Sequence, residues 1–314
     1  MIVLAGLPDE GPIRLAAEAL EALGAPFVVV DQRQHASIDV ALVPAVAGEE
    51  PGGILRLPGS SIDLATVRGV YLRLHGAESI VELAALPEGA PPRARFVRLT
   101  SLLTAFADIS PGVVFNRSPG MITNHSKAYQ AQSIQAMGFI VPTTLITNQP
   151  EEALAFIEER WARGRAVVFK SVSSVRSIVR TVTGDDLKRL ARLRYCPVQF
   201  QERVEGIDYR AHVIGEDVIA TRIETSGTDY RYASREPDGF TSLHAATLPP
   251  AIDARCARLA ASLDLGFAGV DLRRTPEDTW VCFEVNPSPA FSYYQAATGQ
   301  PIAEALARRL ARVG

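Results

Sequence analysis

The chain has 314 residues, enough for two or three compact units that each bury a hydrophobic core. Lys and Arg number 32 against 35 Asp and Glu, and this formal charge of -3 argues against nucleic acid as a partner. No apolar stretch reaches the roughly 18 residues that span a bilayer, and the N-terminus lacks a secretion-signal pattern, which argues against a membrane partner and against secretion.

A parallel α/β unit is predicted at the N-terminus. A buried strand at 2–5, an amphipathic helix at 12–23 and a strand at 27–30 follow one another within about thirty residues, which is typical of a strand-helix-strand unit. A further strand at 67–74 and a helix at 93–107 extend this part of the chain. No G-x-G-x-x-G follows the first strand, so the pattern gives little support to a dinucleotide site.

The rest of the chain mixes helices and strands in an α+β pattern. Pro111, Gly112 and Pro119 mark a loop between the first part and the second. Beyond it we expect helices at 127–137, 151–163, 253–263 and 302–312. We expect a strand that includes residue 146, strands over 166–170, 198–204, 209–214 and 217–225, and a hairpin over 268–286. This order indicates two or three lobes around a cleft.

Three cysteines, Cys196, Cys256 and Cys282, lie far apart in the chain. They show neither C-x-x-C spacing nor an even count, so the sequence predicts neither a disulfide framework nor a zinc site. Such usage is typical of a reducing compartment, and we expect a cytoplasmic protein.

The most informative pattern is the predicted hairpin, which carries Asp271 on its first strand and Glu284 and Asn286 on its second. Residues two apart on a strand leave the same face, so Glu284 and Asn286 point the same way. A four-residue loop at 276–279 sets Asp271 directly opposite Glu284. Carboxylate and amide oxygens together with phosphates suit magnesium, and we predict a magnesium site at these three residues. A solvated hairpin with an acidic outer face is the alternative.

The other face of the hairpin supports that register. It pairs Val270 with Val285 and Leu272 with Phe283, so one face is apolar and the other carries the acids. A slip of one residue would bury the acids.

Two lysines stand at the ends of predicted elements. Lys127 opens a helix, and Lys170 ends an apolar strand. Lysines at such positions can hold nucleotide phosphates as point charges, although either residue alone is more often a surface residue. Ser173 and Ser174, in the loop after Lys170, can donate hydroxyl and backbone N–H groups to phosphate oxygens, although an ordinary polar loop explains them equally well.

Residues 198–210 form a strand, a glycine turn and a second strand. The strand edge after Glu202 can pair with adenine through backbone groups, and Asp208 is placed for ribose hydroxyls. Arg222 and Arg231 follow and can neutralise phosphate oxygens. Each of these observations is weak in isolation, because an aspartate after a turn is often only a turn residue.

The chain order of these features is a lysine, a second lysine, a Gln-Glu hinge, Gly-x-Asp-x-Arg, a distal arginine, an aspartate and Glu-x-Asn-Pro. That order resembles the ATP-grasp superfamily, and its RimK-like branch in particular, from about Asn116 to the C-terminus. Several details look closest to the ATP-grasp peptide maturases of the graspetide or microviridin type. They are Asn116-Arg117, Asn124-His-Ser-Lys127, Gly138-Phe with Pro142-x-Thr-Leu-Ile-Thr-Asn148, Ala220-Thr-Arg-Ile-Glu-Thr-Ser226 and Thr298-Gly-x-Pro-Ile302.

The resemblance implies an α/β N-terminal domain followed by an α+β ATP-grasp fold, in which two lobes clamp ATP. We expect the N-terminal domain at 1–115, a central ATP-grasp lobe at 116–195 and a C-terminal lobe with the metal-binding hairpin at 196–314. The resemblance also implies a homo-oligomer and a peptide or amino-acid substrate.

The roles that the resemblance implies fall into three groups. The catalytic residues are Arg222 and Arg231; the ATP-binding residues are Lys127, Lys170, Ser173, Ser174, Glu202, Arg203, Val204 and Asp208; the magnesium ligands are Asp271, Glu284 and Asn286. The implied chemistry is phosphorylation of a carboxylate to an acylphosphate, which an amine or hydroxyl then attacks, with ADP and phosphate released.

Three other functions remain open at this point. A small-molecule amino-acid or glutamate ligase of the RimK type would use the same residues. A regulator that binds ATP without turnover would have no need of three magnesium ligands. A kinase would share ATP and magnesium but not this residue order. In the N-terminal part, Arg73 and His75 either face a cleft or form the polar face of a half-buried strand.

Overall fold

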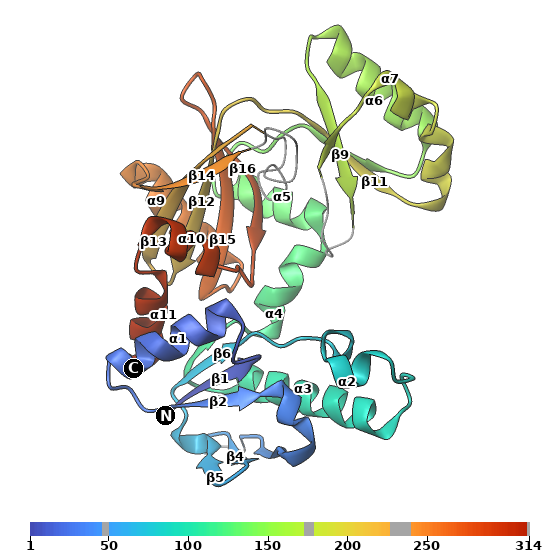
Figure 1. Ribbon diagram of the computed structural model, residues 1–314. Coiled ribbons are helices and arrows are strands. Elements are labelled where there is room, and N and C mark those ends of the chain that lie inside the picture. The colour runs from blue at the N-terminus through green and yellow to red at the C-terminus, as the bar shows by residue number, and fades with distance from the viewer. Residues whose placement is uncertain (46–49, 173–178, 227–239, 313–314) are drawn as a thin grey trace.

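The computed structural model describes residues 1–45, 50–172, 179–226 and 240–312 (Figure 1). The N-terminal part lies at one end of the molecule, below a large antiparallel sheet and a smaller lobe that stand side by side in Figure 1. This arrangement is the expected one: an α/β unit followed by two α+β lobes.

The N-terminal sheet has the strand order β2-β1-β6-β7 and is parallel throughout. Its strands are β1 (Ile2–Gly6), β2 (Phe27–Asp31), β6 (Gly69–Leu72) and β7 (Val113–Phe115), and its helices are α1 (Gly11–Ala22), α2 (Val81–Ala84) and α3 (Pro91–Ile109). The predicted strand-helix-strand unit is confirmed. Helix α1 ends where expected, because Gly24 directly after its cap has φ of +63°, which favours glycine.

A three-stranded antiparallel sheet in this part was missed by the sequence analysis. It consists of β3 (Asp39–Val43), β4 (Gly52–Leu57) and β5 (Ser60–Asp63). Its strands are short and largely exposed, and only alternate residues such as Val40, Leu42 and Leu55 reach the core. Such segments give a weak periodic signal.

The smaller lobe contains a sheet with the strand order β10-β9-β11-β8. Its strands are β8 (Thr144–Thr147), β9 (Val167–Ser171), β10 (Arg180–Thr181) and β11 (Val198–Glu202), with α6 (Pro150–Ala162) and the short α7 (Gly184–Leu187). Strand β11 pairs with both β8 and β9. The expected division between residues 195 and 196 would separate β11 from the sheet that holds it.

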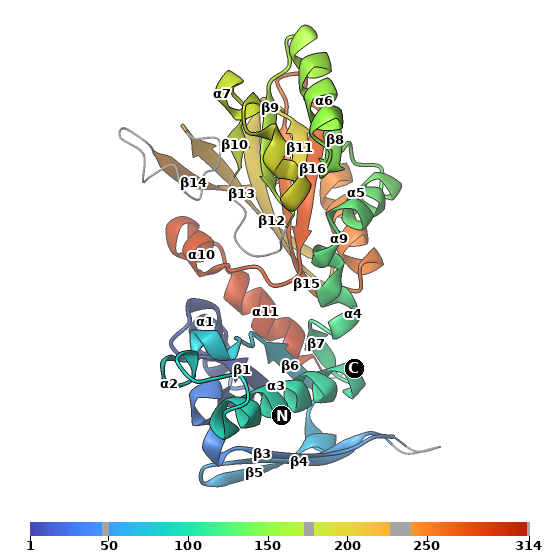
Figure 2. The same cartoon turned by 90° about the vertical axis from the view of Figure 1, so that its right-hand side faces the viewer.

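The large sheet has the strand order β14-β13-β12-β15-β16 and is antiparallel throughout. Its strands are β12 (Ile207–Ile214), β13 (Asp217–Thr225), β14 (Thr241–Ala246), β15 (Phe267–Arg274) and β16 (Trp280–Asn286). Helices α5 (Lys127–Ala136) and α9 (Pro250–Ser262) share a core with one face of this sheet, as Figure 2 also shows. The short α4 (Ser118–Met121) precedes α5.

The other face of the large sheet meets the N-terminal part through α10 (Ser292–Thr298) and α11 (Ile302–Ala311). Ile302, Leu306 and Leu310 recur at helical spacing on α11, and all are buried in one core with Leu20 of α1 and Phe267 of β15. The C-terminal helix therefore joins the two parts of the molecule.

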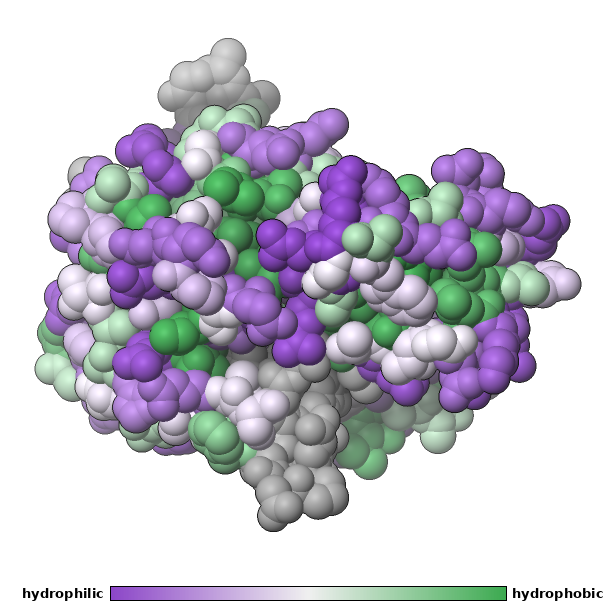
Figure 3. Space-filling model, turned by 90° about the horizontal axis from the view of Figure 1, so that it is seen from above, coloured by the Kyte–Doolittle hydropathy of each residue, from purple (hydrophilic) through white to green (hydrophobic). Residues whose placement is uncertain are grey.

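The surface seen from above is mainly hydrophilic with smaller hydrophobic patches (Figure 3). Among the residues that the structure describes, no helix is both long enough and apolar enough to cross a membrane.

A partly buried ion pair also links the N-terminal sheet to the segment after β16. Arg73 follows β6, and its guanidinium donates to Glu10 Oε1 at 2.5 and 3.0 Å and to the Ser288 hydroxyl at 3.2 Å. His75 Nε2 lies 3.0 Å from Glu10 Oε2. Arg73 therefore faces the contact between the two parts rather than solvent.

This cluster makes stability depend on pH. Burial acts to raise the pKa of Glu10, but the hydrogen bonds from His75 and Arg73 and the charge of Arg73 outweigh it and lower the pKa from 4.5 to about 2. Because the folded-state pKa is the lower one, the stabilisation is complete above pH 4.5 and is lost as the pH falls towards 2.

We expect Glu10→Gln to lower the free energy of unfolding by about 2 kcal/mol at pH 7, and by progressively less below pH 4.5. Urea unfolding across this pH range measures it. Glu18→Gln is the matched control, because Glu18 is exposed and its pair with Arg14 contributes little. An equal loss at pH 7 and at pH 2.5 would show that the charge of Glu10 has no part in the effect.

Candidate active site

A row of charged side chains crosses one face of the large sheet. Arg210 of β12 stands opposite Asp271 of β15, which stands opposite Glu284 of β16. Arg210 Nη1 donates to Asp271 Oδ1 at 2.6 Å, and the arginine is buried. The expected opposition of Asp271 and Glu284 is confirmed.

The predicted hairpin loop and one part of the register are wrong. Arg274 pairs with Trp280, so residues 275–279 connect the strands instead of a four-residue loop at 276–279. A β-bulge between Asp271 and Leu272 places Leu272 opposite Cys282, not opposite Phe283. The extra residue in β16 shifts the alternation there. The Phe283 ring lies against Arg273, whose guanidinium is 5.1 Å from the ring centroid, so Phe283 is not part of the apolar face.

Both predicted lysines converge on Glu284. Lys127 Nζ lies 3.2 Å from Glu284 Oε2 and 2.6 Å from Asn124 Oδ1, and Lys170 Nζ lies 3.6 Å from the same carboxylate oxygen. Lys127 is the first residue of α5, which Ser126 caps with its hydroxyl. A cation in the first turn opposes the helix dipole, so this lysine needs anionic partners.

The lysines control the ionisation of Glu284. Burial acts to raise its pKa, but the charges of Lys170 and Lys127, the hydrogen bond from Lys127 and the charge of Arg210 lower it to about 2. Glu284 is therefore ionised at any physiological pH. An anionic oxygen beside two ammonium groups fits a site for a cation and a polyphosphate together.

Asn286 completes the predicted metal set on the same face. Its Oδ1 accepts a hydrogen bond from the Ser288 N–H at 2.9 Å, which fixes the side chain. The described residues hold no cluster of three or more His, Cys, Asp or Glu side chains suited to a metal. The predicted set instead joins two carboxylates to an amide, hard oxygen donors that fit Mg²⁺.

The predicted adenine hinge follows β11. The Glu202 carboxylate lies 3.3 Å from Arg160 and 3.6 Å from Arg165, and the Arg203 N–H donates to the carbonyl of Ala166 at 2.8 Å. The Val204 carbonyl accepts a hydrogen bond from Arg273 at 2.6 Å. The hinge is therefore held from both sides.

Asp208 is also tied to Arg273. The guanidinium donates to both carboxylate oxygens, at 2.7 and 2.8 Å. Asp208 shares its face of β12 with Arg210, because the two residues are two apart. Arg273 thus links the hinge, Asp208 and Phe283, a role that the sequence analysis did not assign.

The structure does not bring Arg222 to the acidic face. Arg222 of β13 pairs in register with Tyr209, which lies in the core beneath α9. Its guanidinium contacts Glu224 at 2.5 Å, and both side chains are partly exposed. Ser173, Ser174 and Arg231 lie outside the described residues.

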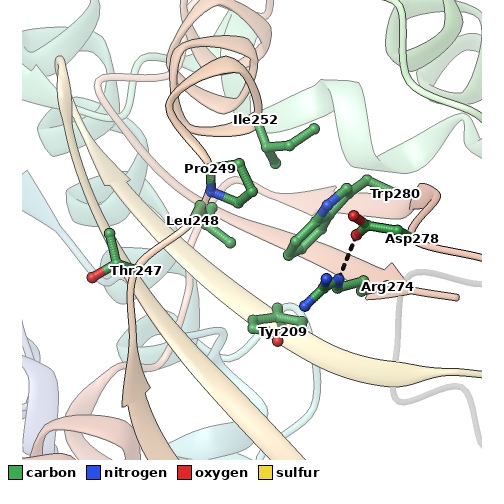
Figure 4. Close-up of a pocket in the computed structure, with 8 residues that line it drawn as sticks. All are labelled: Tyr209, Thr247, Leu248, Pro249, Ile252, Arg274, Asp278 and Trp280. Atoms are coloured by element: carbon green, nitrogen blue, oxygen red, sulfur yellow. Dashed lines mark hydrogen bonds and ion pairs between the residues drawn. The ribbon is translucent and has the colours of Figure 1, made fainter. Parts of the chain in front are cut away.

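A pocket of about 510 Å³ lies on this α9 side of the sheet (Figure 4). Tyr209, Trp280 and the ion pair of Arg274 with Asp278 line part of it. It is therefore separate from the face that carries Asp271 and Glu284.

Arg210 was missed as a site residue, although it ends the Gly-x-Asp-x-Arg pattern. Its position two residues after Asp208 could have identified it, because residues two apart on a strand lie on the same face of the sheet. The approach of Arg210 to Gly269 is close: a Cβ at residue 269 would lie 2.3 Å from Arg210 Nη2. A side chain at residue 269 would therefore have to displace the guanidinium from its present position.

The family model of the RimK-like ATP-grasp domain matches residues 125–310, which is more than half of the chain. The chain belongs to the RimK-like ATP-grasp family. The resemblance and the ATP-grasp fold expected from the sequence are thereby confirmed.

Two solved ATP-grasp structures resemble the whole chain. The macrocyclase MdnC from Microcystis aeruginosa, solved with its precursor peptide, is 24% identical and covers 100% of both chains with a TM-score of 0.79, which shows the fold. The ATP-grasp ligase PsnB, solved with a variant of its minimal precursor, Mg and ADP, is 26% identical with a TM-score of 0.79. That similarity covers 98% of this chain and 97% of PsnB.

A curated relative matches a smaller share of the chain. A probable alpha-L-glutamate ligase of Vibrio cholerae is 27% identical over 197 residues, which is 60% of this chain. The match spans 64% of the length of that relative.

Proposed function

We propose that the protein is an ATP- and magnesium-dependent ligase that joins a carboxylate to an amine or hydroxyl through an acylphosphate. The observation that carries this proposal is the convergence of Lys127 and Lys170 on Glu284, directly opposite Asp271. A polyphosphate supplies the anions that two nearly buried ammonium groups need, and the carboxylates supply the charge for a divalent cation.

The proposed roles follow from position and chemistry. Lys127 and Lys170 bind phosphate oxygens, the hinge of Glu202, Arg203 and Val204 binds adenine, and Asp208 binds ribose. Ser173, Ser174 and Arg231 are further proposed phosphate contacts. Asp271, Glu284 and Asn286 would hold magnesium, which when bound neutralises charge on the transferring phosphoryl group.

Arg210 takes the catalytic position that the sequence analysis proposed for Arg222. It is buried on the acidic face and hydrogen-bonded to Asp271, so it can offset developing negative charge without reorganising. Such preorganised donors act most strongly where water is excluded.

The proposed substrate is a peptide that supplies the carboxylate and the nucleophile. PsnB, which was solved with a precursor peptide, is similar to this chain over its N-terminal part as well as its ATP-grasp fold. The match to the Vibrio cholerae glutamate ligase covers 60% of the chain, and addition of glutamate or another amino acid is the second candidate.

Three further proposals concern the organisation of the protein. We propose an N-terminal domain at 1–115, and a boundary between the ATP-grasp lobes after β11 instead of at 195 and 196, because β11 belongs to the sheet of the central lobe. The described cysteines form no disulfide, in keeping with a cytoplasmic protein. A homo-oligomer stays a prediction.

Products of the reaction test the proposed function. Incubation with ATP, Mg²⁺ and an acceptor peptide rich in Asp, Glu, Ser, Thr and Lys should give ADP and phosphate, and a peptide lighter by one water per bond. When free glutamate or another amino acid is also supplied, a peptide heavier by one residue would favour the amino-acid ligase. AMP as the stoichiometric nucleotide product, or a stable phosphorylated peptide, would contradict the ligase mechanism, and ATP binding without turnover would indicate a regulator.

A further inference from the structure

The outer edge of β16 is closed by a side chain. β16 is the edge strand of the large sheet, and Val285 lies between the proposed ligands Glu284 and Asn286. Gln130 of α5 donates from Nε2 to the Val285 carbonyl at 2.7 Å, and the Val285 N–H donates to Gln130 Oε1 at 2.9 Å. One amide group thus replaces the pair of bonds that a neighbouring strand would make.

Gln130 is placed by the same helix as Lys127. The two residues are three apart, so they share one face of α5. Lys127 reaches the Glu284 carboxylate, while Gln130 holds the next residue of β16 by its backbone. One helix therefore positions both the Lys127 ammonium group and the segment of β16 that carries Glu284.

Burial leaves Gln130 without access to water. The residue is only 1% exposed, so its amide depends on Val285 for hydrogen bonds. An edge strand can satisfy its outer N–H and C=O groups with water, and fold stability alone does not require a buried glutamine there. Two other contacts hold this segment on either side of Val285. The Ile140 carbonyl accepts from the Cys282 N–H at 2.9 Å, and Asn116 donates to the carbonyl of Pro287, directly after β16, at 2.6 Å.

We propose that Gln130 is a positioning residue that fixes Glu284 and Asn286 relative to Lys127 for binding of the divalent cation. This inference rests on the proposed function. Metal sites need their ligands within about 0.5 Å of the required geometry, and groups that orient the ligands typically change metal affinity by about 10- to 100-fold when lost.

The test compares Gln130→Met with Gln32→Met. Gln32 is also fully buried and makes the same pair of bonds to the backbone of another residue, His75, at 2.8 and 3.2 Å. Both substitutions keep the side-chain length and remove one buried amide pair. Gln32→Met also removes a hydrogen bond to the Thr100 hydroxyl at 3.3 Å, so its general loss of stability should be at least as large as that of Gln130→Met. Only Gln130 touches the strand of the proposed ligands.

The readout is binding of Mn²⁺ to the ADP-loaded protein, followed by electron paramagnetic resonance. We expect Gln130→Met to raise the Kd for Mn²⁺ by at least about 10-fold while Gln32→Met leaves it within about 2-fold. Hydrogen exchange at the Val285 amide should become faster in Gln130→Met alone. Gln130→Glu, which keeps the acceptor for the Val285 N–H, should lie between wild type and Gln130→Met and serves if the methionine variant does not fold.

An unchanged Kd for Mn²⁺ in both Gln130 variants, or an equal change in Gln32→Met, would overturn the inference while leaving the proposed function intact. Wild-type protein that binds no Mn²⁺ with ADP would overturn the proposed function and this inference together.

Discussion

Glu284→Gln is expected to lower ATP turnover by at least about 100-fold. The substitution keeps the shape of the side chain but removes the charge that a magnesium ion needs. It also leaves Lys127 and Lys170 without their shared carboxylate, which lies 3.2 and 3.6 Å away. The free lysines remain available to phosphate, so we expect metal-free ATP to bind at least as tightly as in wild type.

The two effects can be measured separately, by steady-state release of phosphate and by titration of ATP in the presence of a chelator. Glu224→Gln is the matched control, because Glu224 pairs with Arg222 of its own strand and is partly exposed. Turnover at the wild-type rate in Glu284→Gln would remove this carboxylate from the metal site.

The second large effect is expected at Arg210. Arg210→Met should lower turnover by about 100-fold, because it removes a buried donor beside Asp271. The same change at Arg222, which pairs in register with Tyr209 on the α9 side of the sheet, should lower turnover by less than about 3-fold.

Steady-state kinetics of Arg210→Met and Arg222→Met decide between these two arginines. Arg210→Lys keeps a charge beside Asp271 and guards against loss of the fold, and should recover only part of the activity, since lysine lacks the planar fork of arginine. A larger loss at Arg222 than at Arg210 would restore the role that the sequence analysis gave to Arg222.

The parts of the site that follow from local periodicity could be predicted from the sequence. Alternation in a strand placed Glu284 and Asn286 on one face. The opposition of Asp271 and Glu284 was also predicted correctly, but not for the right reason: Arg274 pairs with Trp280, so the predicted loop at 276–279 is wrong, and the β-bulge restores the pairing. The bulge at Leu272 could not be predicted, because its cost is offset by packing of Phe283 against Arg273, a contact between residues on two strands.

Contacts between distant segments explain the other differences. Which face Arg222 occupies depends on the register of β13 with β12, and no single strand contains that information. In the sequence Gln130 is one polar residue of a predicted helix. Its contact with the backbone of Val285 depends on how that helix packs against β16. The role of Arg210 could have been predicted, since its spacing of two residues from Asp208 is visible in the sequence.

The most direct test of the central claim is the fate of a heavy-oxygen label in the carboxylate of the acceptor peptide. An acylphosphate route moves one labelled oxygen from that carboxylate into inorganic phosphate for each bond formed, with ADP as the nucleotide product. Mass spectrometry of the released phosphate should therefore show the label in proportion to the bonds in the peptide. Label in AMP, or unlabelled phosphate alongside a modified peptide, would contradict the account.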